Sequence, residues 1–229
     1  MNNTAYLILL EAFFILLTGI SFIIAKKIYS KFKLPLLNPI ITSVVIIIGF
    51  LTLFNIEYST YCSNTRLLKF ILDVSVVAFG YLLYENIEFL KKNTTTILLA
   101  NIIGSSIGIG SVLIIAYLLN TKGIITMSMV SKSITTPLAI EISKNLGGIT
   151  SLTAVIVVFS GILGAVVGHT IFQIFNIKSP FARGIALGTS AHGLGTARAL
   201  EYGALEGALG GLSIGLMGLF TSLISFFLQ

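Results

Sequence analysis

The chain has 229 residues and a formal net charge of +6, with 55% hydrophobic and only 10% charged residues. Soluble domains carry about 25% charged residues, so this composition, with a mean hydropathy of +1.02, excludes a large soluble enzyme, a nucleic-acid-binding protein and a disordered regulator. It predicts a single all-α polytopic membrane domain over residues 1–229, surrounded by the lipid bilayer.

Six apolar stretches approach the length of about 20 residues that a transmembrane helix needs. In chain order they are Tyr6–Ala25, Pro39–Phe54, Leu67–Tyr84, Thr96–Leu119, Ile149–Ile171 and Gly207–Leu228. We expect each of them to span the membrane. The third stretch contains Asp73, and an ionisable residue at membrane depth is a functional candidate.

Two further segments, 127–147 and 184–203, have the length of a span but the wrong chemistry. The first holds Lys132, Pro137, Glu141 and Lys144. The second holds His192, Arg198, Glu201 and five glycines (Gly184, Gly188, Gly193, Gly195 and Gly203). Such backbone is tolerated at membrane depth only where protein or a water-filled cavity surrounds it. We therefore expect two broken or re-entrant helices in the interior, and the sequence leaves open whether they cross or return.

Basic residues gather in the loops after the first and third apolar stretches, which hold six lysines (Lys26, Lys27, Lys31, Lys33, Lys91 and Lys92). The opposite loops hold three basic residues (Arg66, Lys69 and Lys122). Because basic loops stay in the cytoplasm, we expect the amino terminus to lie outside.

The two interrupted segments share a weak internal repeat. Aligning ITTPLAIE (Ile134–Glu141) with LGTARALE (Leu194–Glu201) pairs Thr136 with Thr196 and Glu141 with Glu201. Paired broken segments in corresponding halves of a chain indicate a transporter's substrate site. Shared composition could give the same matches, so an inverted repeat and chance similarity both stay open.

The first segment reads as an unwound turn that leads into a helix. Thr135 or Thr136 can cap this helix, and Pro137 suits its first position. An open helix start offers free N–H groups and a positive dipole end to an anion. We predict that a substrate carboxylate docks at Ser133–Thr136, with Glu141 close by. The alternative is that the threonines only cap a packed helix.

The second segment carries most of the candidate binding residues, which are Thr189, Ser190, His192, Gly193, Gly195, Thr196, Arg198 and Glu201. Its glycines let the backbone approach a ligand, the Arg198 guanidinium suits a carboxylate, and His192 can exchange a proton near neutral pH. Two alternatives remain open. Arg198 can instead pair with Glu201 at spacing i, i+3, and His192 can bond a backbone carbonyl.

The remaining glycines suggest packing, and no catalytic pattern emerges. Gly161, Gly164 and Gly168, with the glycines of 207–218, are predicted to form close helix-packing faces. We see no nucleophile with a base, no metal-ligand spacing and no phosphate loop. We therefore expect neither an enzyme nor a bound cofactor or metal.

The interrupted segments resemble the LrgB/CidB family of bacterial membrane proteins. The strings that carry the resemblance are KSITTPLAIEISKNLGGITSLTAV (132–155) and SPFARGIALGTSAHGLGTARALEYGALEGA (179–208). The resemblance implies a multi-pass protein of the bacterial cell membrane that regulates murein hydrolase export and cell lysis. It also implies a small LrgA/CidA-like membrane partner and a relationship to the plastid glycolate/glycerate transporter, which moves small monocarboxylates.

Between these two functions the residues favour transport. A protein that only forms a hole has no need of an intramembrane arginine, two broken threonine motifs and a histidine, whereas a carboxylate carrier does. We therefore expect a transporter of pyruvate-like or glycolate-like acids, with the antiholin-like role as the alternative and a homo-oligomer left open. This hypothesis requires the two interrupted segments to meet inside the bilayer.

Overall fold

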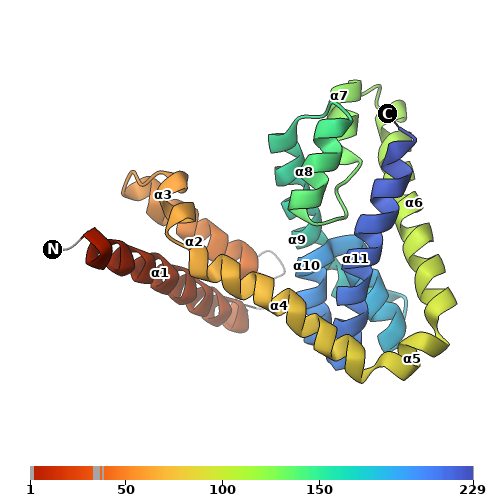
Figure 1. Cartoon of the computed structure of the whole chain (residues 1–229), viewed down its shortest axis with the longest axis horizontal. Helices are drawn as coiled ribbons and strands as arrows, with labels where there is room; N and C mark the ends of the chain where they lie inside the picture. Colours follow the sequence, from red (N-terminus) through yellow and green to blue (C-terminus); the bar gives the residue numbers. More distant parts are fainter. Residues whose placement is uncertain (1–2, 33–36, 38, 229) are drawn as a thin grey trace. The chain divides into compact units, whose positions relative to one another are not determined.

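The computed structural model describes residues 3–32, 37 and 39–228, and these residues form eleven helices and no strands (Figure 1). The chain divides into two compact units, Met1–Val77 and Ala78–Gln229. The long helix α4 (Arg66–Glu85) runs across the division between them.

The first unit is a small cluster of helices: α1 (Asn3–Phe32), α2 (Pro39–Leu53), α3 (Tyr58–Ser63) and the beginning of α4. α1 packs along α2, and α3 is fixed to α1 by an aromatic contact and a hydrogen bond. The ring of Tyr61 meets Phe14 edge-on, and its hydroxyl lies 2.9 Å from Oγ1 of Thr18. The side chain of Asp73 lies outside what the structure describes.

The second unit contains the remaining helices, which are α5 (Ile87–Lys92), α6 (Thr94–Leu118), α7 (Gly123–Met129), α8 (Thr136–Asn145), α9 (Thr150–Ile174), α10 (Pro180–Leu200) and α11 (Ala204–Phe226). Its polarity is reversed relative to a soluble protein. Asn101, Thr153 and Ser213 are fully buried, whereas Ile107 and Phe159 are exposed. Polar residues inside and apolar residues outside are the pattern that a lipid surrounding favours.

Four described helices are long and apolar enough to cross a membrane, namely Ile8–Phe32, Thr94–Leu118, Thr150–Ile174 and Ala204–Phe226. α2 is a shorter apolar helix, and α4 covers the third predicted stretch. All six apolar stretches are therefore helical as predicted, and the chain is an α-helical polytopic membrane protein.

The segment predicted to be interrupted at 127–147 forms a re-entrant hairpin, which we call hairpin 1 (residues 123–145, α7 and α8). Ser131 near its turn donates from Oγ to the Ala139 carbonyl, at 3.1 Å. Farther from the turn, the Ser128 carbonyl accepts a bond from Thr153 Oγ1 at 2.9 Å, which ties α7 to the beginning of α9. The chain therefore leaves hairpin 1 at the end of the unit where it entered.

The second interrupted segment also turns back, because α10 is two helices joined at a kink. His192 has φ 42° and ψ −125°, far from helical values. Arg183 near the start of α10 lies over the ring of Tyr202, two residues after the end of that helix, with the guanidinium carbon 5.2 Å from the ring centre. The two arms of hairpin 2 (residues 180–200) are thus antiparallel.

The hairpins enter the second unit from opposite ends. Hairpin 1 follows the carboxyl end of α6, and α9 then runs for 25 residues, about 37 Å, before hairpin 2 begins (Figure 1). ITTPLAIE and LGTARALE accordingly occupy corresponding places, since each contributes to the returning arm of a hairpin.

Glycines on α9 and α11 let the hairpins pack closely, as predicted. A Cβ placed on Gly164 of α9 would lie 2.6 Å from Cβ of Ala191 in hairpin 2. On α11, Gly210 faces Thr196 of hairpin 2, whereas Gly218 faces Leu138 of hairpin 1. α11 therefore supports hairpin 2 on its first half and hairpin 1 on its second half.

Candidate functional site at the hairpin turns

The turns of the two hairpins meet on one face of α6. A Cβ placed on Gly108 would lie 3.6 Å from Oγ of Ser133, in the turn of hairpin 1. A Cβ placed on Gly104 would lie 3.6 Å from Cβ of Thr189, just before the break in hairpin 2. Residues four apart share a helix face and are separated by about 6 Å along the axis. The two interrupted segments therefore meet at the middle of α6.

The turn of hairpin 1 presents an open helix start. Thr135 occupies the N-cap position of α8, but its side chain makes no capping hydrogen bond, and Pro137 is the second rather than the first helical residue. The expected threonine cap is therefore absent at Thr135, which leaves the first N–H groups of α8 without that partner. The helix ends at a glycine turn, with Gly147 at φ +74° and the Gly148 N–H bonded to the Ser143 carbonyl at 2.8 Å.

Lys132 supplies a positive charge at this turn. It is half-buried, and its Nζ donates to Oγ of Ser133 at 3.3 Å. A lysine beside an uncapped helix start combines two features that favour an anion. The sequence pattern marks Lys132 only as one of the charged residues of the interrupted segment. Its position directly before Ser133 was the signal that could have placed it in the site.

His192 forms the turn of hairpin 2 and anchors it to α9. Its ring is buried, with Nε2 at 3.2 Å from the Val157 carbonyl. Since a carbonyl can only accept, Nε2 carries the hydrogen of this bond. The absence of a side chain at Gly161 leaves space for the imidazole, because a Cβ there would lie 2.7 Å from its Cε1. The structure thus contains the hydrogen bond to a backbone carbonyl that was the alternative role for His192.

Three buried polar groups close to hairpin 2 have no hydrogen-bond partner among the described residues. They are Oδ1 of Asn101 on α6, Oγ1 of Thr196 and Oγ of Ser213 on α11. Ser213 lies against Gly188, and Thr196 lies against Gly210. A buried polar atom without a partner is unfavourable, and such an atom often marks the place of a water or ligand. Of the three, only Thr196 stands out in the sequence, because Asn101 and Ser213 lie inside ordinary apolar spans.

The other predicted residues of hairpins 1 and 2 differ in how far they are exposed. Ser190 is exposed and donates to the Ala186 carbonyl of its own helix at 2.6 Å, and Thr189 donates to the same carbonyl at 3.2 Å. Glu141 and Gly193 are exposed. Gly195 is buried directly against the Leu187 carbonyl, so its role is close packing between the arms.

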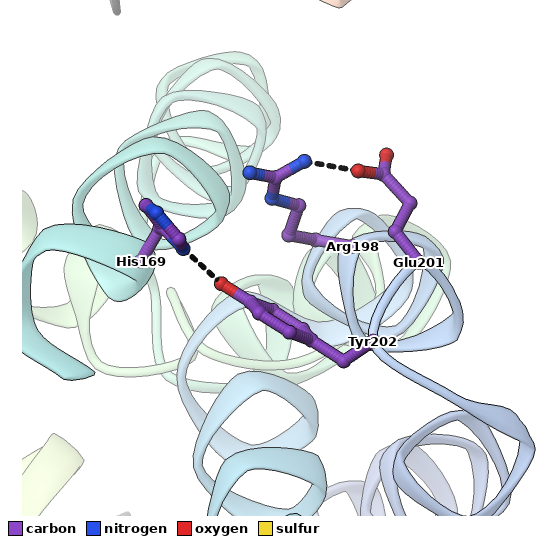
Figure 2. A network of polar contacts seen from close by, with 4 residues as sticks. All are labelled: His169, Arg198, Glu201 and Tyr202. Atoms are coloured by element: carbon purple, nitrogen blue, oxygen red, sulfur yellow. Dashed lines mark hydrogen bonds and ion pairs between the residues drawn. The ribbon is translucent and has the colours of Figure 1, made fainter. Parts of the chain in front are cut away.

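Arg198 and Glu201 lie at the far end of hairpin 2, where they form an ion pair with each other (Figure 2). Arg198 also lies over the ring of Tyr202, whose hydroxyl is hydrogen-bonded to His169 of α9. His169 is 12 residues beyond Val157, about 18 Å along the helix. The structure therefore does not bring Arg198 to Thr135 and Thr136, and it contains the ion pair that was the alternative.

Apolar side chains pack tightly around hairpin 1, while Ser133 at its turn is only partly buried. Ile134, Ala139, Val157 and Met217 pack around hairpin 1 and are almost completely buried. Two pockets among the described residues lie elsewhere, one of about 460 Å³ beside Glu11 and one of about 240 Å³ at the loop between α6 and α7.

Comparison with known proteins finds relatives along most of the chain. The sequence profile of the LrgB-like family matches residues 18–229. Uncharacterized protein YwbG of Bacillus subtilis is 35% identical over 205 residues, which cover 90% of this chain and 91% of that protein. Antiholin-like protein LrgB of the same organism is 30% identical over 206 residues, covering 90% and 88%. No solved structure matches the chain.

Proposed function

This chain belongs to the LrgB-like family, and we propose that it acts as an antiholin-like membrane protein that regulates cell lysis. The support is its similarity to proteins named antiholin-like protein LrgB, which extends over most of both chains. In this role we expect the protein to lie in the bacterial cell membrane with a small LrgA-type membrane protein as its partner.

The antiholin-like role is tested by measuring lysis. The protein is produced, with and without an LrgA-type partner, in bacteria that lack their own LrgB-like gene. Production of the protein is expected to change the rate of detergent-induced autolysis and the murein hydrolase activity outside the cells. Unchanged lysis and hydrolase activity at equal membrane levels of the protein would contradict the role.

A carrier of small carboxylates is the second candidate, and one observation favours it. Hairpins that enter from opposite ends and meet at the centre of a span are typical of secondary transporters, whose substrate sites lie at such breaks. A protein that only regulates a pore does not require this arrangement.

The chemistry at the turn of hairpin 1 suits a small acid such as pyruvate or glycolate. Lys132 offers a cation, Ser133 a hydroxyl, and the start of α8 free N–H groups, and charge-assisted bonds of this kind are the strong ones. Because Lys132 is beside Ser133, whereas Arg198 is paired with Glu201 at the other end of hairpin 2, we assign the role of anion partner to Lys132.

A flux assay separates the two candidates. Proteoliposomes are assayed for uptake of labelled pyruvate, glycolate and lactate, with and without an LrgA-type partner. A carrier gives saturable uptake in which the acids compete. Unsaturable leakage of unrelated solutes, or no flux at all in either preparation, would contradict the carrier hypothesis and leave the antiholin-like proposal untouched.

The charges of the second unit support an orientation. The end that holds α5 and both ends of hairpin 2 has five basic residues (Lys91, Lys92, Lys178, Arg183 and Arg198), and the opposite end has two (Lys122 and Lys144). Basic ends stay in the cytoplasm. Hairpin 2 is therefore proposed to enter from the cytoplasm and hairpin 1 from outside, which agrees with an external amino terminus.

A further inference from the structure

Two arginines from the two arms of hairpin 2 converge on one tyrosine. The guanidinium carbon of Arg183, in the first arm, is 5.2 Å from the ring centre of Tyr202, and that of Arg198, in the second arm, is 5.8 Å from it. Arg183 also lies 6.0 Å from the ring centre of Phe172 on α9. Cation–π contacts of this kind hold both charges on one aromatic surface.

Hydrogen bonds fix this arrangement to α9 and to the loop before hairpin 2. The hydroxyl of Tyr202 is bonded to Nδ1 of His169 (Figure 2). Nε2 of His169 lies 3.0 Å from the amide nitrogen of Gln173. Nε of Arg183 donates to the Ile177 carbonyl at 2.8 Å. The ring and the Arg183 guanidinium are therefore held in place before any ligand arrives.

The charges in this cluster are not balanced. Glu201 pairs with Arg198, but Arg183 forms no ion pair within the described part of the chain. Two guanidinium groups against one ring repel each other unless an anion lies between them. Arg198 remains partly exposed, at 28% of its side chain, so an anion can approach from outside.

The cluster lies where lipid headgroups are expected. The apolar span of α9 ends at Ile174 and that of α11 begins at Ala204, so Arg183, Arg198 and Tyr202 lie close to the ends of two spans. Tyrosine and arginine both favour this boundary, and the guanidinium fork matches two phosphate oxygens. We propose that Arg183 and Arg198 together bind the phosphate of an anionic phospholipid headgroup. The proposal does not depend on whether the protein carries a solute.

The test measures lipid retention by native mass spectrometry of the purified protein titrated with phosphatidylglycerol or phosphatidylcholine. The wild type is expected to retain phosphatidylglycerol in preference. Arg183→Gln and Arg198→Gln are each expected to weaken that binding by roughly tenfold or more, because each removes a charge-assisted hydrogen bond to the phosphate. The control is Lys178→Gln, which removes the same charge from an exposed residue in the adjoining loop and is expected to leave binding within about twofold.

Three results would overturn the proposal: equal weakening by Lys178→Gln, equal retention of the two lipids by the wild type, or full displacement of the lipid by millimolar inorganic phosphate. Arg183→Lys and Arg198→Lys are controls for a loss of binding caused by misfolding, because they keep the positive charge at the cluster. They are expected to unfold at the wild-type temperature. They are expected to bind phosphatidylglycerol more weakly than the wild type, since a lysine ammonium group cannot form the two parallel hydrogen bonds of a guanidinium group. Wild-type lipid binding by both would contradict the bidentate contact.

Discussion

Ser133 and Thr189 lie against the same face of α6, one helical turn apart, although 55 residues separate them in the chain and their hairpins enter from opposite ends of the unit. Both side chains lie within ordinary van der Waals distance of the Cβ positions of residues 108 and 104, respectively. This relationship places the uncapped start of α8, Lys132 and the break at His192 close to the middle of one transmembrane helix. It is the basis of the carrier hypothesis.

Lys132→Gln tests the anion site. We expect the substitution to raise the KM for carboxylate uptake by roughly tenfold or more, because it removes a hydrogen bond between charged groups. The matched control is Lys144→Gln at the exposed end of α8, which is expected to leave KM unchanged. Equal effects of the two variants would indicate a general charge effect and refute the site. Arg198→Gln is expected to change KM less than Lys132→Gln.

Gly164→Ala tests the close packing of hairpin 2 on α9. A Cβ at this position would lie 2.6 Å from Cβ of Ala191, and overpacking of this kind costs about 1–3 kcal/mol of unfolding free energy. Gly215→Ala in α11 is the control, since no atom lies within 4 Å of its Cβ position and alanine favours a helix. Unfolding in detergent gives both values, and the prediction fails if Gly164→Ala is as stable as Gly215→Ala.

His192 is the residue at which hairpin 2 turns, and its substitution tests the stability of that turn. Its φ of 42° strains any residue other than glycine, and its ring bonds the Val157 carbonyl. His192→Val is expected to lose more than about 2 kcal/mol of stability, because it combines a strained β-branched residue with the loss of a hydrogen bond. His192→Gly loses the bond but relieves the strain, so its unfolding midpoint is expected to lie between those of His192→Val and the wild type. A midpoint for His192→Gly below that of His192→Val would contradict this account.

Orientation is tested by cysteine labelling in intact cells, on a background without the exposed Cys62. A membrane-impermeant maleimide is expected to label Lys122→Cys, at the end proposed to face outward, and to label Lys178→Cys only after the cells are opened. The reverse pattern would invert the proposed topology.

The sequence allowed the helices to be predicted but not the path of the two interrupted segments. Apolar length was enough for α6, α9 and α11, and Lys132, Pro137 and the glycines marked the breaks. Whether a broken helix crosses the membrane or turns back depends on the backbone conformation of a single residue. In hairpin 2 that residue is His192, not one of the neighbouring glycines. No local pattern indicates such a position.

The candidate site was predicted only in part, for a similar reason. Ser133, Thr135 and Thr196 carry a signal because they lie in segments that Pro137 or several glycines interrupt. Asn101 and Ser213 lie in apolar spans, and only the packing of α6 and α11 around hairpin 2 shows that they are buried without partners. Arg198 was expected at the site because it is a charged residue in a broken segment, but the distance from its end of hairpin 2 to the turn could not be known before the fold.

The meeting of the two hairpins on α6 is tested most directly by a disulfide. A Cβ on Gly104 would lie 3.6 Å from Cβ of Thr189, within the range that a disulfide needs. Gly104→Cys combined with Thr189→Cys, on the Cys62→Ser background, is expected to cross-link readily in membranes under mild oxidation. Gly110→Cys with Thr189→Cys is the control and is expected to stay reduced, because Gly110 has no neighbour within 4 Å. Failure of the first pair to cross-link, or equal cross-linking of both pairs, would contradict the convergence on which the carrier hypothesis rests.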